Sequence, residues 1–220
     1  MNLDYLNIGL FIRIAIPLCF MLLFLRGTAK SRMHFFLFGL IACLFSGELN
    51  GLLFKSMNLK YAAFTSIITP IVEEVSKAFP LFLSVVLLRP KRKDLLENAM
   101  TLAIGFAILE NACTVFDGTD SSTMIASALT RCFYTSFLHV FFTNLVAFAM
   151  SFIDKNKKIF AICTPLALIF VICLHGLCNF IMSTKYWYLS YCLDFVMMIT
   201  TFNINIAYNK KHSNKFFIKY

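Results

Sequence analysis

The chain has 220 residues, of which 60% are hydrophobic and only 14% are charged. This composition excludes an ordinary soluble globule, because too few polar residues are present to cover its surface. The net charge of +9 does not indicate nucleic-acid binding, since the basic residues fall in short runs between apolar segments and form no single patch. We therefore expect an all-α, polytopic membrane protein in which residues 1–220 form a single transmembrane domain.

Seven apolar segments follow one another along the chain, and a bilayer is crossed by a helix of about 20 such residues. The segments cover roughly residues 6–25, 35–54, 65–88, 95–116, 133–153, 159–183 and 186–208. The more polar stretch 120–131 is predicted to form a short interfacial helix that leads into the fifth segment. The pattern predicts a bundle of seven transmembrane helices.

The connections between these segments alternate in charge. Lys and Arg are concentrated in the connections at 26–32, 89–93 and 154–158 and in the tail at 210–219. All of these fall on one side of a seven-helix arrangement, and the other connections carry less positive charge. Because positively charged loops stay in the cytoplasm, the pattern predicts an N-terminus outside the cell and a cytoplasmic C-terminus.

The third apolar segment carries the most unusual feature of the sequence. Glu73, Glu74 and Lys77 lie near its middle, where each charge costs roughly 2.5–3.5 kcal/mol on insertion scales. Ionisable residues kept at membrane depth are candidates for a functional site. Pro70 and Pro80 are predicted to kink the same helix and to free backbone carbonyl groups beside the carboxylates.

Polar residues of several segments are predicted to share one depth in the outer leaflet. At 1.5 Å per residue, the carboxylates and imidazoles lie roughly 9–12 Å from the outer ends of their helices. The predicted layer consists of Glu48, Glu73, Glu74, Glu110, Asn111, His139, His175 and Asn179. Arg13 lies at a similar depth, and we expect it to form a structural ion pair with Glu48.

Helical spacing predicts which of these residues are neighbours. Glu73 and Lys77 are four residues apart and in the favourable order for an ion pair. His175 and Asn179 have the same spacing and therefore share a helix face. Glu73 and Glu74 point about 100° apart on a helix, so we expect the two carboxylates to do different jobs.

Carboxylates, imidazoles and amides around a small aqueous pocket are suited to hydrolysis. A glutamate can take a proton from water while a histidine or a second glutamate donates to the leaving group. The N–H groups of His or Asn can stabilise an oxyanion. The same groups could instead bind a divalent metal such as zinc, with His139, His175 and Glu110 as candidate ligands.

Two functions other than hydrolysis stay open from the residues alone. Glu and His side chains inside a membrane also form the proton relays of proton- or ion-coupled transporters. A non-catalytic receptor or immunity protein is the other alternative, and it predicts that the polar layer tolerates substitution.

Three short motifs occur in order on separate segments, with His139 on the segment between the last two. Residues 73–77 match EExxK, residues 106–111 match FxxxEN and residues 175–179 match HxxxN. This ordered set resembles the PrsW family of intramembrane proteases, which is distantly similar to the CAAX-protease and bacteriocin-processing superfamily. The resemblance covers about residues 65–183, which would form the motif-bearing core of the domain.

The resemblance implies an intramembrane protease of the bacterial cell membrane whose substrate is a single-span membrane protein. It implies the first (site-1) cleavage of a membrane-anchored anti-sigma factor on its extracytoplasmic side, so that later processing releases an extracytoplasmic-function sigma factor. The catalytic residues carried over are Glu73, Glu74, Glu110, His139 and His175, with Lys77, Asn111 and Asn179 in support. The superfamily is described both as metal-dependent and as glutamate-type, so the resemblance leaves that choice open.

Overall fold

The computed structural model describes residue 12 and residues 29–113 and 121–213 of the chain. Within this part the secondary structure is helical and contains no strand. The predicted all-α fold is therefore confirmed there. Most of the first predicted apolar segment, including Arg13, lies outside the described residues.

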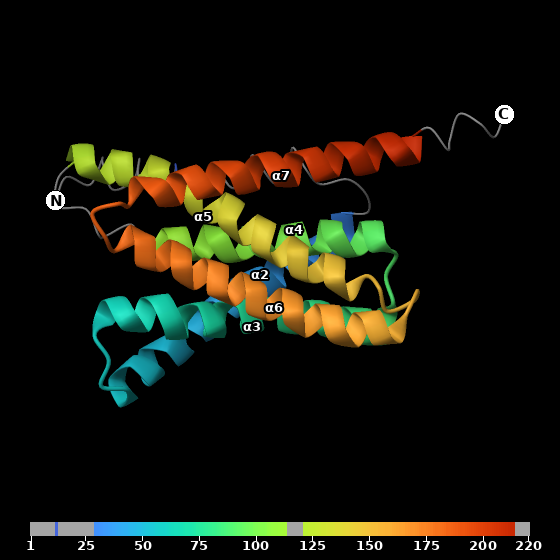
Figure 1. Cartoon of the computed structure of the whole chain (residues 1–220), viewed down its shortest axis with the longest axis horizontal. Helices are drawn as coiled ribbons and strands as arrows, with labels where there is room; N and C mark the ends of the chain where they lie inside the picture. The colour runs from blue at the N-terminus through green and yellow to red at the C-terminus, as the bar shows by residue number, and fades with distance from the viewer. Residues whose placement is uncertain (1–11, 13–28, 114–120, 214–220) are drawn as a thin grey trace.

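The helices that the described residues form run in chain order as shown in Figure 1. They are α2 (Ala29–Ser56), α3 (Tyr61–Leu88), α4 (Arg92–Cys113), α5 (Ser121–Met150), α6 (Lys157–Met182) and α7 (Tyr188–Ser213). They match the second to seventh predicted segments. The separate interfacial helix predicted at 120–131 was wrong, because α5 continues from Ser121 to Met150. No Pro or Gly interrupts that stretch, and each added helical residue gains a hydrogen bond.

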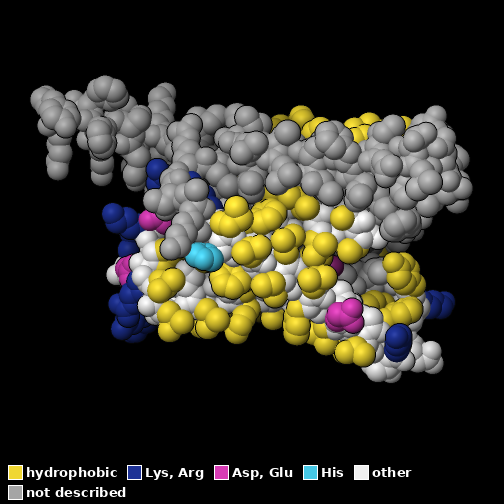
Figure 2. Space-filling model, turned by 180° about the vertical axis from the view of Figure 1, so that it is seen from behind, with side chains coloured by type: hydrophobic (Ala, Val, Ile, Leu, Met, Phe, Trp, Pro, Cys, Tyr) yellow, Lys and Arg dark blue, Asp and Glu magenta, His cyan; other side chains and the backbone are white. Residues whose placement is uncertain are grey.

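The outer surface of the bundle is apolar, as expected of a membrane protein. Segments Arg32–Ser56, Ala128–Met150 and Lys157–Met182 are long and apolar enough to cross a bilayer. Figure 2 shows hydrophobic side chains across the middle of one face and Lys and Arg gathered toward its ends. The count of seven spans and the orientation of the termini remain predictions.

Helix α4 is enclosed by the rest of the bundle. Every residue from Glu97 to Ile108 is buried, so the helix has neighbours on all sides, chiefly α2 and α5. An ion pair between Arg32 and Glu97 ties α2 to α4. The main core collects side chains from α2 to α7, among them Phe35, Leu81, Leu102, Phe142 and Val171. On the other side of the bundle, α3 packs against α6 and α2.

Two glycines allow α2 and α4 to approach closely. A Cβ atom at Gly39 would lie 2.1 Å from the carbonyl oxygen of Leu102, and one at Gly105 would lie 2.3 Å from that of Phe36. Small residues at helix crossings let membrane helices pack backbone against backbone. This crossing sets which face of each helix points into the bundle.

We expect Gly39→Ala to destabilise the protein by about 1–3 kcal/mol, because the added methyl group meets backbone atoms that cannot rotate away. Gly47→Ala is the matched control on the same helix, since a Cβ atom there meets nothing within 4 Å. Alanine also favours a helix by up to about 1 kcal/mol over glycine. Thermal unfolding in detergent measures both variants, and equal unfolding temperatures would contradict the close approach.

Candidate active site

Side chains from four helices meet inside the bundle and form what we call the polar cluster. It consists of Glu73, Glu74 and Lys77 on α3, Glu110 on α4, His139 on α5 and His175 on α6. All of them are buried except Glu110, which is half-buried. Residues predicted to share one depth on separate helices are thus neighbours in space.

Glu74 lies at the centre of the polar cluster. The Lys77 Nζ atom donates a hydrogen bond to Glu74 Oε1 at 2.7 Å, and His175 Nδ1 lies 2.8 Å from the same oxygen. An ionised carboxylate only accepts hydrogen bonds, so Nδ1 of His175 carries the proton and its Nε2 keeps a lone pair.

The predicted ion pair between Glu73 and Lys77 was wrong. Lys77 pairs with Glu74, three residues away, because its ammonium group also reaches across to His139 on α5. Both partners of the Lys77–Glu74 pair are almost completely buried. The spacing rule correctly placed a carboxylate beside Lys77 but selected the wrong one of two adjacent glutamates.

Lys77 also connects the cluster to α4 through His139. Its Nζ atom lies 2.8 Å from His139 Nδ1, and an ammonium group only donates, so Nδ1 accepts and the imidazole proton lies on Nε2. That proton is donated to Glu110 Oε2 at 2.5 Å, a short charge-assisted bond. The Phe106 ring lies 4.7 Å from Nζ and 5.0 Å from the imidazole centroid, so it supports both groups.

Glu73 is the carboxylate that these contacts leave out. Its Oε2 atom is buried and has no hydrogen-bond partner among the described residues. It faces His175 Nε2 at 3.8 Å, a separation too long for a hydrogen bond. Ligand atoms of Glu73, Glu110 and His139 all lie within 4.8 Å of one another. The Glu73 side chain, with one open carboxylate oxygen, therefore lies close to two histidines and a second carboxylate.

This set of donor atoms fits a divalent metal ion. Zinc binds imidazole nitrogen and carboxylate oxygen, and Glu73, Glu110 and His139 are close enough to share one ion. The Nδ1–H contact from His175 to the Glu74 carboxylate is the arrangement that orients metal-binding histidines. The geometry thus puts Glu73 in the place of His175 among the predicted candidates, and His175 lies outside this group.

The two asparagines of the predicted layer contact neighbouring helices. Thr135 Oγ1 on α5 donates to Asn111 Oδ1 at 2.8 Å, and Asn179 Nδ2 donates to the Thr65 carbonyl oxygen at 2.9 Å. The first bond joins α4 to α5 and the second joins α6 to α3. Asn179 and His175 both face α3, as their spacing predicts.

Glu48 lies apart from the polar cluster. Its side chain is exposed on α2, and its predicted partner Arg13 lies outside the described residues. Nine residues separate Glu48 from Gly39, which places it roughly on the opposite side of the helix. Since Gly39 faces α4, the packing of α2 turns Glu48 outward.

Two residues that the motifs did not identify also shape the site. The Arg131 Nη2 atom on α5 lies 3.7 Å from Glu110 Oε1. The sequence signal that could have identified Arg131 is its position eight residues before His139 on the same helix. Gly176 occupies a variable position of HxxxN. A Cβ atom there would lie 2.3 Å from the Ser66 carbonyl oxygen, which Pro70 leaves without its usual helical donor.

The sequence of the chain matches a known protein family. The model of the family described as PrsW family intramembrane metalloprotease matches residues 28–204. The chain belongs to the PrsW family. No curated protein and no solved structure matches the chain. Membership of the PrsW family makes the protein an intramembrane protease with a membrane-embedded substrate, and a metalloprotease is compatible with the Glu73, Glu110 and His139 group.

We expect Lys77→Met to destabilise this PrsW-family protein by about 3–5 kcal/mol, because it leaves the Glu74 charge buried without its ion-pair partner. Lys93→Met is the control, since Lys93 is 49% exposed and lies 4.0 Å from its acidic neighbour. It should change stability by no more than about 0.5 kcal/mol. Thermal unfolding in detergent gives both values. Similar shifts for the two variants would contradict a buried ion pair at Lys77.

Proposed function

We propose that this protease makes the first cut in a membrane-anchored anti-sigma factor on its extracytoplasmic side, so that later processing releases an extracytoplasmic-function sigma factor. The substrate in this proposal is the one that the resemblance to the PrsW family implies. The observation that carries the hydrolytic part is the buried Oε2 atom of Glu73, which has no hydrogen-bond partner among the described residues although His175, His139 and Glu110 lie close to the Glu73 side chain. Buried polar atoms are almost always hydrogen-bonded. An exception at this position is suited to a water molecule, a metal ion or the substrate.

Peptide hydrolysis needs a group that takes a proton from water and returns it to the leaving amine. We assign this role to Glu73, whose Oε2 atom would accept the proton and then pass it to the amide nitrogen as the C–N bond breaks. His175 Nε2, at 3.8 Å from that oxygen, would hold the attacking water between the two side chains. The Oε1 atom of Glu74 already accepts from Lys77 and His175, so Glu74 would orient His175 and leave the proton transfer to Glu73.

The other members of the polar cluster would hold this geometry. Glu110 and His139 form the opposite wall, and Lys77 balances the charge of Glu74. Asn111 and Asn179 would keep the helix pairs α4–α5 and α3–α6 in register through their hydrogen bonds.

A divalent metal such as zinc would give a second form of this proposal, in which Glu73 is a metal ligand in place of the proton acceptor. Glu73, Glu110 and His139 would hold the ion, with His175 at the edge of the site. When bound, the ion would act as a Lewis acid toward the scissile carbonyl group and the water. Nε2 of His139 would first have to release the proton that it donates to Glu110. The alternative is a reaction in which Glu73 activates the water without a metal, and measuring the metal content separates these two mechanisms.

The location of cleavage rests on the charge pattern of the chain. Basic connections on one side would place the polar cluster in the outer leaflet of the bacterial cell membrane, with a cytoplasmic C-terminus. In this arrangement the single domain of seven spans would reach a peptide bond near the outer end of a single-span substrate. Membership of a protease family favours this function over proton- or ion-coupled transport.

Co-expression with a tagged single-span anti-sigma factor tests the proposed function. We expect the wild type to cleave it and Glu73→Gln to slow cleavage by about 10²–10⁴-fold, the usual contribution of a general base. Glu74→Gln and His175→Ala should also slow it, while Glu48→Gln, outside the polar cluster, should not. Unchanged cleavage in all three cluster variants would refute the assignment.

Metal content separates the two mechanisms. If Glu73 and Glu110 are ligands, Glu73→Gln and Glu110→Gln should lower the zinc bound per purified protein molecule, because a neutral amide is a much poorer ligand than a carboxylate. Glu48→Gln should bind as much zinc as the wild type. Elemental analysis before and after chelation measures this directly. Full cleavage activity in chelated, zinc-free wild type would favour the mechanism that uses Glu73 alone.

A further inference from the structure

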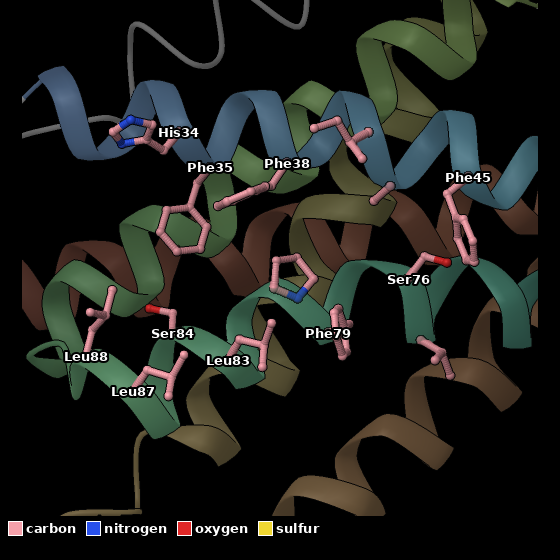
Figure 3. A pocket seen from close by; sticks show the side chains of 14 residues that line it. His34, Phe35, Phe38, Phe45, Ser76, Phe79, Leu83, Ser84, Leu87 and Leu88 are labelled. Carbon is pink, nitrogen blue, oxygen red and sulfur yellow. The ribbon is translucent and has the colours of Figure 1, made fainter.

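An apolar groove runs along the outside of the bundle between α2 and α3 (Figure 3). Its volume is about 890 Å³, and its walls are almost entirely apolar. Phe35, Phe38 and Phe45 line it from α2, and Phe79, Leu83 and Leu87 line it from α3. The other half of the α2–α3 hairpin is closed, because Phe54 packs against Phe64 with ring centroids 5.1 Å apart.

One end of this groove adjoins the active site. Val75 and Ser76 line the groove, and in sequence they lie between the Glu74 and Lys77 residues of the polar cluster. On the α2 side, Ala42 lines the groove and packs with the Phe106 side chain. The same Phe106 ring lies close to Lys77 and His139 of the polar cluster. Helix α3 and the Phe106 side chain thus connect this end of the groove to the site.

The groove extends from the site in one direction. Figure 3 shows Phe45 and Ser76 at one end and His34 and Leu88 at the other. The 13 residue steps from Val75 to Leu88 correspond to about 20 Å of helix. The far end leads to the basic connection at 89–93, which the charge pattern assigns to the cytoplasmic side.

We propose that this groove holds the transmembrane helix of the substrate and presents its outer end to the polar cluster. The inference rests on the proposed function, because it needs a single-span protein as the substrate. A helix lying along 20 Å of α3, about two-thirds of a bilayer core, would have its cytoplasmic part in the groove. Its extracytoplasmic end would reach the level of Glu73, where the proposed cut is made.

The shape of the α3 wall favours a helix in the groove. Ser76, Pro80 and Ser84 form a row of short side chains at a spacing of four, beside the longer row of Phe79 and Leu83. Ridges and grooves of this kind are what a second helix packs into, and short side chains let membrane helices approach closely.

The N-terminal segment of the chain is a weaker candidate for this position. Its one described residue, Ile12, has a carbonyl oxygen that accepts a hydrogen bond from Cys132 Sγ on α5. Among the described side chains, those that line the groove come from α2 and α3 and none from α5. The contact therefore places this point of the segment beside a different helix.

Photocrosslinking in the Glu73→Gln protein, which should bind the substrate without cutting it, tests the groove. Benzoylphenylalanine is placed at Leu83 in the groove or, as control, at the 57% exposed Ile169 of α6. We expect position 83 to capture the transmembrane segment of the co-expressed tagged anti-sigma factor, and position 169 to capture little of it. The inference would be overturned if position 83 captured something other than the substrate, namely lipid, a second copy of the chain or the chain's own residues 13–28.

A second pair of variants measures the effect on cleavage. Leu83→Trp partly fills the groove and should slow cleavage of the anti-sigma factor by about tenfold or more, whereas Ile169→Trp should stay within about twofold of the wild type. Equal cleavage by the two variants, together with no adduct at position 83, would refute the groove while leaving the proposed function intact. If the wild type leaves the anti-sigma factor uncut, the proposed function is refuted. The substrate helix is then also refuted as the occupant of the groove.

Discussion

The carboxylate of Glu74 accepts hydrogen bonds from Lys77 in its own helix and from His175 in α6, and all three side chains are buried. An ionised carboxylate at such a position costs several kcal/mol unless it is compensated. Lys77 continues the connection to His139, and His139 continues it to Glu110. These contacts link α3, α4, α5 and α6 at one level. A rotation of any of these helices about its axis would break at least one contact, so the network also fixes the geometry of the site.

Glu73 has a different environment although it is the neighbour of Glu74 in sequence. Successive side chains on a helix project about 100° apart, so Glu73 faces Glu110 and His139 with its Oε2 atom unpartnered among the described residues. The Glu74 carboxylate is compensated by a cation and an imidazole, whereas the Oε2 atom of Glu73 is left open. Local departures from good hydrogen bonding are expected where a side chain is kept for chemistry.

Helix α3 combines two surfaces that an intramembrane protease needs. Its inner face carries Glu73, Glu74 and Lys77 of the polar cluster, and its outer face forms one wall of the groove shared with α2. The inner face depends on α6, which approaches α3 at Gly176, where a Cβ atom would meet the Ser66 carbonyl oxygen. Helix α4, enclosed on all sides, supplies Glu110 and the Phe106 ring, which lies close to Lys77 and packs with Ala42 of the groove.

The sequence by itself determined the helices and the residue types of the site. Long apolar runs predict helices because a backbone in lipid must satisfy its own hydrogen bonds, and charges such as Glu73 and Glu110 are conspicuous because lipid makes them costly. The motifs also predicted the family, and α5 began furthest ahead of its apolar pattern, at Ser121 instead of about residue 133.

Only the tertiary structure decided how those residues are paired. It selected Glu74 as the partner of Lys77, brought Glu73 beside His139, turned Glu48 outward and added Arg131 to the site. The physical reason is that a sequence specifies the angles between side chains along one helix. The rotation of that helix about its axis is set by contacts with other helices, such as the approach of α2 to α4 at Gly39.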